Sequence, residues 1–170
     1  EAKEWTTRNS LGRWPSTDLI QNIISSGCHV VPVAYASNSG NNIEWRYSFS
    51  IAEVALIRSL SVNHRHVYVI FKDIYSEELK HFQILSSYHL KTIFMWTCEK
   101  TSANGVTNVN IAKFLLQLLD ELIYCLAERN IPNYFIPANN MIDHVPLDFI
   151  KNLAQKCVHI RKNPLYYISR

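Results

Sequence analysis

The chain has 170 residues, of which 48% are apolar and 18% charged. This composition supports one domain-sized core and excludes disorder as the main state. The 4 glycines and 6 prolines exclude collagen-like and low-complexity sequences, and no apolar run approaches the roughly 18 residues of a membrane span. A net charge of +3 permits nucleic-acid binding without indicating it, because that function needs clustered positive charge.

The cysteines and the first residues bear on the compartment. The charged, mixed start shows no signal peptide. Cys28, Cys98, Cys125 and Cys157 lie far apart, without a CxxC pair. We therefore expect mostly buried, reduced thiols in a cytoplasmic or nuclear protein, with disulfides in a secreted domain as the alternative.

The N-terminal part predicts a short helix, a β-hairpin and a second helix. Residues 1–15 read as an irregular segment that docks on another surface. Ser16 opens a helix that Gly27 ends, and residues 28–35 and 43–49 read as strands around the polar turn 36–42.

Residues 50–53 (SIAE) predict a capping box at the start of a helix that runs to about Leu60. In this box the Ser50 hydroxyl accepts from the Glu53 amide, and the Glu53 carboxylate reaches back to the Ser50 amide. Phe49 and Val54 occupy the positions of a hydrophobic staple.

The rest of the chain predicts four further helices. Apolar spacing marks one over residues 63–80, Ser86 or Ser87 caps the next, and Asn110 caps a long one with a broad apolar stripe. Residues 133–140 read as an extended connector. A last helix starts at Pro146 and runs to about Lys162, with these residues inward: Leu147, Ile150, Ala154, Cys157 and Val158. The expected fold is mainly α, a helical bundle of about six helices with one short β-hairpin.

Common catalytic signatures are absent. The sequence holds no GxxxxGK[ST], GxGxxG, HExxH or GxSxG motif. The acid pairs Glu77–Glu78 and Asp120–Glu121 read as solvated helix surface, since adjacent helical side chains point about 100° apart and do not converge on a metal. Residues 64–66 (HRH) lack a nearby Cys or His pair for zinc and read as the first turn of an exposed helix. A basic corner that touches phosphates is the alternative.

A second group of residues suits an anionic ligand. In the predicted strand Arg46, Ser48 and Ser50 share one face, and the opposite, aromatic face (Trp45, Tyr47, Phe49) is expected to be buried. Lys72 offers a phosphate-binding charge. A hydroxyl and free amides at the helix start near Ser87 favour phosphate, and Tyr88 can stack on a base. Ordinary caps and surface positions are the alternative reading.

Four segments resemble the Mab (male-abnormal-twenty-one) family, which includes cyclic GMP-AMP synthase and the animal receptors similar to it. They are residues 27–33 (GCHVVPV), 44–53 (EWRYSFSIAE), 86–99 (SSYHLKTIFMWTCE) and 133–137 (NYFIP). They occur in the family's order, and the resemblance spans about residues 14–141. It implies a nucleotidyltransferase fold in which residues 1–49 end the connecting core and residues 50–170 form the C-terminal helical lobe.

The resemblance also implies roles. Arg46 and Ser48 would face the acceptor nucleotide, Lys72 and Ser87 the phosphates, and Tyr88 would stack on a base. Glu53 matches a position near the second nucleotide, although its expected capping role also explains it. No Gly-Ser loop followed by strand-borne acids is found. We therefore expect no catalytic residue and no cofactor in this fragment, with Mg²⁺ or Mn²⁺ bound in a separate N-terminal catalytic lobe.

One departure from the family concerns zinc. Cyclic GMP-AMP synthase carries a zinc thumb after the helix that the SFS motif starts, whereas residues 59–66 (SLSVNHRH) contain no cysteine. The expectation is therefore no zinc thumb. This weakens the case for double-stranded DNA as the ligand and leaves RNA, another ligand or none open.

Three functions follow as hypotheses. The first is the C-terminal lobe of a cyclic GMP-AMP synthase-like nucleotidyltransferase of innate immunity. Its partners would be the catalytic lobe, nucleoside triphosphates and double-stranded RNA or DNA, without a membrane. The second is a non-catalytic Mab-family module that binds nucleotides or proteins in development or signalling. The third is a free-standing helical interaction domain, against which exposed Trp5, Trp14 and strand edges would argue.

Overall fold

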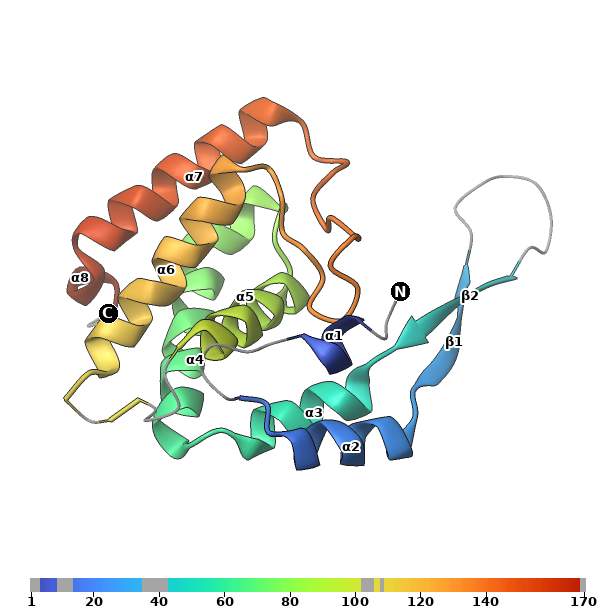
Figure 1. The fold of residues 1–170 in the computed structure, drawn as a ribbon. Helices are drawn as coiled ribbons and strands as arrows, with labels where there is room; N and C mark the ends of the chain where they lie inside the picture. Colours follow the sequence, from blue (N-terminus) through green and yellow to red (C-terminus); the bar gives the residue numbers. More distant parts are fainter. Residues whose placement is uncertain (1–3, 9–13, 35–42, 102–105, 108, 169–170) are drawn as a thin grey trace. The chain divides into compact units, whose positions relative to one another are not determined.

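The computed structural model describes residues 4–8, 14–34, 43–101, 106–107 and 109–168. Within these ranges the chain forms eight α-helices and one two-stranded antiparallel sheet (Figure 1). This confirms the expected mainly helical class. The chain divides into two compact units, one of Pro15–Leu60 and one that joins Glu1–Trp14 to Ser61–Arg170. The domain boundary that we expect between residues 49 and 50 stays a prediction.

The unit of residues 15–60 has the expected order of helix, hairpin and helix. Helix α2 (Thr17–Ser26) starts at Ser16, whose hydroxyl accepts from the Leu19 amide at 3.3 Å, and ends at Gly27, which has a φ of 69°. Strands β1 (His29–Ala34) and β2 (Ile43–Ser48) pair antiparallel, and α3 (Ser50–Ser59) packs on α2. The expected turn over residues 36–42 lies outside the described residues.

The expected capping box at Ser50 is wrong. Helix α3 begins one residue earlier, because the Phe49 carbonyl accepts from the Glu53 amide at 2.8 Å without a side-chain cap. Ser50 is therefore already helical, and its hydroxyl accepts from the Ser48 hydroxyl at 3.3 Å. Val54 is 48% exposed, so it does not act as a staple. The cap moves back because β2 leads into the helix with only Phe49 between them.

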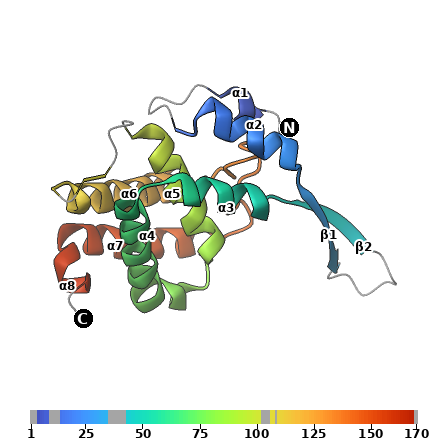
Figure 2. The same cartoon turned by 90° about the horizontal axis from the view of Figure 1, so that it is seen from below.

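The helices of the second unit pack around the apolar face of one amphipathic helix, α6. Its helices are α4 (Val62–Ile74), which continues through the π-helical turn η1 (Tyr75–Leu79) and the 3-10 turn η2 (Lys80–Phe82), α5 (Ser87–Lys100), α6 (Ile111–Ala127), α7 (Leu147–Lys162) and α8 (Pro164–Ile168). Helix α6 packs against α4, α5 and α7 (Figure 2). Its predicted apolar stripe is buried: Phe114, Leu115, Leu118, Leu119, Leu122, Cys125 and Leu126.

Three details of this unit differ from the expectations. Asn110 is the N-cap residue of α6 as expected, but its side chain accepts from the Thr107 amide at 2.7 Å, in the preceding turn, and makes no capping hydrogen bond. Along α7, Leu147 and Val158 are 40% and 38% exposed. The buried stripe repeats at intervals of three and four residues instead: Ile150, Leu153, Cys157 and Ile160.

Residues 133–140 form a compact turn, so the expected extended connector is wrong. The Asn133 side-chain oxygen accepts from the amides of Phe135 and Ile136 at 2.9 and 3.1 Å. Tyr134 and Phe135 are fully buried. An asparagine that satisfies two following amides folds the backbone back on itself, which lets adjacent aromatic side chains enter the core.

The N-terminal segment docks within its own chain. Helix α1 (Glu4–Thr7) places Trp5 edge-on to Phe135, with ring centroids 5.3 Å apart. Trp5 is 6% exposed and Trp14 is half-buried, so the expectation that these tryptophans are exposed is wrong. These two tryptophans therefore do not argue against a free-standing domain, whereas Trp45 and Tyr47 of the hairpin are both 65% exposed.

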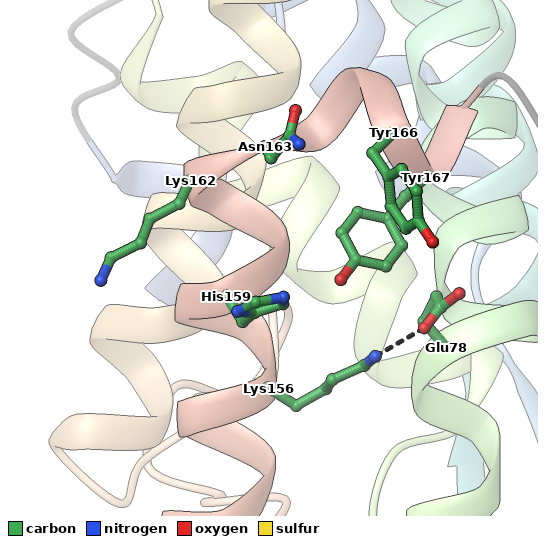
Figure 3. Close-up of a pocket in the computed structure, with 7 residues that line it drawn as sticks. All are labelled: Glu78, Lys156, His159, Lys162, Asn163, Tyr166 and Tyr167. Carbon is green, nitrogen blue, oxygen red and sulfur yellow. Dashed lines mark hydrogen bonds and ion pairs between the residues drawn. The ribbon is translucent and has the colours of Figure 1, made fainter.

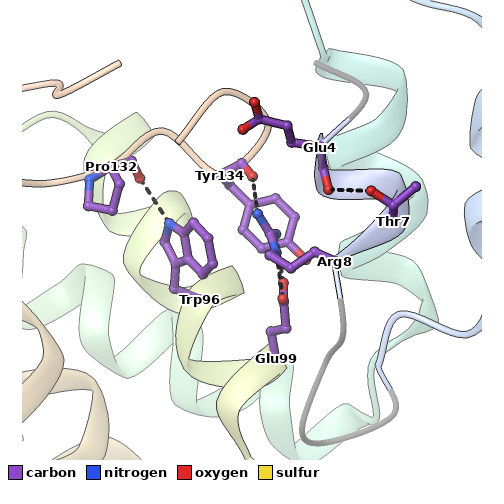
Figure 4. Close-up of polar contacts among 7 residues, drawn as sticks. All are labelled: Glu4, Thr7, Arg8, Trp96, Glu99, Pro132 and Tyr134. Atoms are coloured by element: carbon purple, nitrogen blue, oxygen red, sulfur yellow. Dashed lines mark hydrogen bonds and ion pairs between the residues drawn. The ribbon is translucent and has the colours of Figure 1, made fainter. Parts of the chain in front are cut away.

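Arg8 holds this segment in place (Figure 4). Its Nε and Nη2 donate to the two carboxylate oxygens of Glu99 at 2.6 and 2.7 Å, and its Nη1 donates to the Tyr134 carbonyl at 3.2 Å. The guanidinium carbon lies 4.0 Å from the centroid of the Trp96 ring. The side chains of Arg8 and Glu99 are only 19% and 7% exposed, so solvent screens the pair weakly.

We expect Arg8→Ala to lower the free energy of unfolding by about 3 kcal/mol, because it leaves the Glu99 carboxylate buried without its cation. Chemical denaturation measures this loss. The combined Arg8→Met and Glu99→Leu variant should recover much of it, since no charge then stays uncompensated. Lys151→Ala is the matched control, since its pair with Asp148 is solvent-exposed. A loss for Arg8→Ala no larger than for the control would contradict the assignment.

Candidate functional site

The five predicted site residues are carried by both units. Arg46 and Ser48 belong to the unit of residues 15–60, and Lys72, Ser87 and Tyr88 to the other.

Arg46 and Ser48 lie on the same face of β2, as the strand period requires. Arg46 is exposed, and the Ser48 hydroxyl donates to Ser50. The opposite face carries Trp45 and Tyr47, which are both 65% exposed, so the expected burial of this aromatic face is wrong. A two-stranded sheet has no second layer of its own to cover such a face.

Lys72 lies on the exposed side of α4. Its ammonium nitrogen is 5.8 Å from the centroid of the Tyr68 ring, which in turn stacks on Phe94 of α5 at 4.6 Å. Shortly after Lys72, the Tyr75 hydroxyl donates to the Leu85 carbonyl at 2.8 Å. This hydrogen bond ties the end of α4 to the segment that leads into Ser87.

The start of α5 is a capping box built with a histidine. The Ser86 amide donates to Nδ1 of His89 at 2.9 Å, and the Ser86 hydroxyl lies 2.8 Å from the same nitrogen. Nε2 of His89 lies 3.3 Å from the Met141 carbonyl, which can only accept. These partners define a neutral imidazole with its proton on Nε2. Ser87 follows as the first helical residue, exposed at the positive end of the helix dipole.

Tyr88 is held from the turn at residues 133–140. Its hydroxyl accepts from the Asn133 side-chain amide at 3.1 Å, so the segments 86–99 and 133–137 that carry the family resemblance meet here. The Lys91 ammonium lies 6.0 Å from the centroid of the Tyr88 ring. Serine, tyrosine and lysine thus share the first turns of α5, an arrangement that can receive a phosphate and a planar ring.

Sequence reasoning missed Lys91 and Asn133 as site residues. The spacing of Lys91, three residues after Tyr88, places both on one helix face and could have identified it. Asn133 is 45 residues from Tyr88, and no local pattern links the two.

The expectation of an exposed turn is wrong for His64. It is 7% exposed, its Nδ1 lies 2.8 Å from the Ser61 hydroxyl, and its ring packs edge-on to Phe114 at 5.2 Å. His66 is exposed, as expected. Burial lowers the pKa of His64 from its ordinary value. His64 is therefore a structural contact between α4 and α6.

Glu53 and the acid pairs have structural settings. Glu53 is 7% exposed within α3. Glu78 binds Lys156, and Glu121 binds Lys100, each at 2.6 Å, with carboxylate side chains 15% and 16% exposed. These two acids are thus partly buried in ion pairs between elements, and the reading of solvated surface is wrong for them.

Among the residues that the structure describes, no three His, Cys, Asp or Glu side chains form a possible metal site. The connection between α3 and α4, where cyclic GMP-AMP synthase carries its zinc thumb, consists of Leu60 and Ser61 alone.

All four cysteines are free, and Cys28 alone of them is exposed. Burial raises the pKa values of Cys125 and Cys157 to about 12, so these thiols are poor nucleophiles. In the described part of the chain no helix has the length and apolar character to cross a membrane.

Two family models match the chain, and the boundary between them lies near residue 60, where the two structural units also meet in sequence, although residues 1–14 belong to the unit of residues 61–170. Residues 1–59 match the model of the Mab-21 protein nucleotidyltransferase domain, and residues 63–159 match that of the Mab-21 protein HhH/H2TH-like domain. Together they define a protein of the nucleotidyltransferase class with a helical C-terminal part. The chain belongs to the Mab-21 family.

Three relatives show how far the similarity extends. The chain is 26% identical to a mab-21-like 3 protein of Danio rerio over 163 residues, covering 92% of this chain and 40% of that protein. It is 27% identical to a cyclic GMP-AMP synthase-like receptor of Nicrophorus vespilloides, covering 74% of this chain and 34% of that protein. It is 28% identical to the cyclic GMP-AMP synthase-like receptor 3 of Stylophora pistillata, covering 69% of this chain and 36% of that protein. The chain therefore spans 34–40% of the length of these relatives.

The histidine cap makes stability depend on pH. Burial lowers the pKa of His89 from its ordinary 6.5, and the charge of His144 adds to this, whereas the hydrogen bond to Met141 opposes it. The unfolded chain therefore takes up a proton first as the pH falls. The contribution of neutral His89 to the free energy of unfolding is fully present above about pH 6.5, the pKa in the unfolded chain. It decreases as the pH falls toward the lowered pKa of the folded state.

We expect His89→Gln to retain the cap, since a glutamine oxygen at this position also accepts from the Ser86 amide, and to lose part of the pH dependence. Denaturation at about pH 7.5 and about pH 5 measures both effects, with the remaining slope including His64. His89→Ala should also flatten the slope but lower stability at both pH values. An unchanged slope in His89→Gln would refute the role of His89.

Proposed function

We propose that this chain supplies nucleotide-binding side chains of a cyclic GMP-AMP synthase-like nucleotidyltransferase. The observation that carries the proposal is the fixed start of α5, where Ser87 and Tyr88 are held between the His89 cap and the Asn133 hydrogen bond. Its first-turn amides and the Ser87 hydroxyl suit a phosphate, and the ring of Tyr88 suits a base.

The other predicted residues are proposed to bind nucleotide from within their own units. Lys72 contributes positive charge from α4 in the same unit as Ser87. Lys91 is the second lysine, and its ammonium group lies beside the Tyr88 ring. From the hairpin, the exposed Arg46 offers a planar donor pair for the acceptor nucleotide, with Ser48 on the same strand face.

Nucleotidyl transfer itself requires metal-binding carboxylates in addition to the side chains named above. Nucleotidyl transfer to a hydroxyl uses two Mg²⁺ or Mn²⁺ ions held by converging carboxylates, and the described residues offer no such cluster. In this proposal an N-terminal catalytic lobe binds the metal ions. The exposed Trp45 and Tyr47 face is suited to packing against further parts of that lobe.

The proposed biological setting follows from the relatives. Two of them are named cyclic GMP-AMP synthase-like receptors, and we propose that the protein senses double-stranded RNA or DNA in innate immunity, in the cytoplasm or nucleus. The second candidate is a non-catalytic module of development or signalling. Its support is that the mab-21-like 3 relative, which is not named a receptor, matches over 92% of this chain against 74% and 69% for the receptors.

Product formation separates these candidates. The full-length protein, with the proposed catalytic lobe, is incubated with ATP, GTP and Mn²⁺, with and without double-stranded RNA or DNA, and the products are separated by chromatography. A cyclic dinucleotide that depends on nucleic acid supports the receptor. Nucleotide binding without any product supports the non-catalytic module.

We expect Tyr88→Ala to weaken binding of ATP or GTP by roughly 5-fold or more, because base stacking on an aromatic ring contributes about 1–3 kcal/mol. Tyr88→Phe keeps the ring and should bind within about 2-fold of the unmodified protein despite losing the bond to Asn133. Isothermal titration calorimetry measures both affinities, and Lys151→Ala on α7 controls for a general loss of positive charge. Equal affinities for Tyr88→Ala and Tyr88→Phe would exclude the stacking role.

A further inference from the structure

A histidine lies at the start of α5, beside the proposed phosphate site. Nδ1 of His89 accepts from the Ser86 amide at 2.9 Å, and its Nε2 lies 3.3 Å from the Met141 carbonyl. The ring therefore reaches back from the third helical residue to the residue before the helix, along the first turn of α5. A phosphate bound by the amides of this turn and by Ser87 would lie within one helical turn of the imidazole.

Burial keeps this ring neutral. It is the main cause that lowers the pKa of His89, because it disfavours the charged imidazolium. The exposed His144, which lies 3.3 Å from the Asp143 carboxylate, adds to this effect. The helices α4 and α6 pack against α5, and among the described residues neither Lys72 of α4, nor any charged group of α6, nor Lys91 of α5 itself affects this pKa. The described chain thus offers no carboxylate that favours the charged form of the ring.

The charged ring nevertheless has hydrogen-bond acceptors in place. Protonated on both nitrogens, His89 can only donate. Its Nε2 would keep the Met141 carbonyl, and its Nδ1 would exchange the Ser86 amide for the Ser86 hydroxyl oxygen, which already lies 2.8 Å away. Protonation therefore leaves each ring nitrogen with an acceptor, and it adds positive charge at the helix end that already favours anions.

An anion beside this ring favours the protonated form, because a nearby opposite charge stabilises the imidazolium. We propose that binding of a nucleotide phosphate at the start of α5 takes up a proton from solvent at His89, so that the site binds anions more tightly as the pH falls. The coupling is reciprocal, since the anion favours the proton by the same factor as the proton favours the anion. This inference rests on the proposed function and adds a proton to the ligands of that site.

The probe is adenosine 5′-phosphosulfate, which offers a base and an anion and has no group that titrates near neutral pH. A nucleoside triphosphate is unsuitable, because its terminal phosphate titrates in the same range as histidine. Titration calorimetry at about pH 6, in two buffers of different ionisation enthalpy, measures the proton uptake. We expect uptake on binding and an affinity about 5-fold or more higher at about pH 5.5 than at about pH 7.5. NMR should show the His89 ring titrating at a higher pH with the probe bound.

Three variants assign the proton. His89→Gln keeps an acceptor for the Ser86 amide but cannot titrate, so its affinity should be the same at both pH values. His159→Gln is the matched control, since His159 is an exposed histidine of α7 whose ring lies edge-on to Tyr167 at 6.3 Å (Figure 3), and it should keep the pH dependence. Tyr88→Ala should weaken binding at both pH values with an unchanged ratio, which locates the probe at α5. Thermal unfolding at each pH verifies that every protein is folded.

Binding without proton uptake, or equal affinities of the unmodified protein at both pH values, would overturn the inference and leave the proposed function standing. A pH dependence that persists in His89→Gln would place the proton on another group and overturn it as well. Should His89→Gln not fold, the NMR titration of the unmodified protein decides, and an unchanged His89 midpoint contradicts the proposal. Absence of binding at either pH would overturn the proposed function together with this inference.

Discussion

The Arg8 guanidinium connects three segments of the unit that joins residues 1–14 to residues 61–170. It donates to Glu99 on α5 and to the carbonyl of Tyr134, which follow Arg8 in the sequence by 91 and 126 positions. Trp96, whose ring lies beneath the guanidinium, donates in turn to the Pro132 carbonyl at 2.9 Å. The N-terminal segment, the end of α5 and the turn after α6 are thereby fixed by one side chain.

The turn that Arg8 holds also contacts the candidate site at the start of α5. Arg8 holds the carbonyl of Tyr134, and the residue before it, Asn133, donates to the hydroxyl of Tyr88. Burial raises the pKa of the Tyr134 phenol, and the nearby Glu99 carboxylate adds to this effect, so the phenol stays neutral. Since the guanidinium and carboxylate are largely withdrawn from water, the arrangement tolerates the loss of neither partner.

Local patterns in the sequence predicted the local structure well. The cap at Ser16 and the apolar stripe of α6 depend on residues a few positions apart, and the two paired strands are joined by one short polar segment. The capping box at Ser50 had the right residue types, yet the strand before it moved the cap to Phe49. A pattern of four residues does not contain the geometry of the chain that enters it.

What the sequence could not show was contact over a distance. The partner of Arg8, the role of Asn133 and the burial of His64 each depend on residues at least 45 positions away. The exposure of Trp45 and Tyr47 was missed for the opposite reason, since an aromatic strand face is buried only where a second layer covers it. Lys72, Ser87 and Tyr88 were found from their chemistry and the family resemblance, and their binding roles stay predictions.

The choice of histidine to close the box at the start of α5 has an electrostatic consequence. A glutamate in this position would leave a full negative charge within one turn of the free amides. Neutral His89 accepts from the same Ser86 amide and adds no charge. An approaching phosphate therefore meets a helix end whose own cap does not repel it, and the helix keeps its cap and its positive potential together.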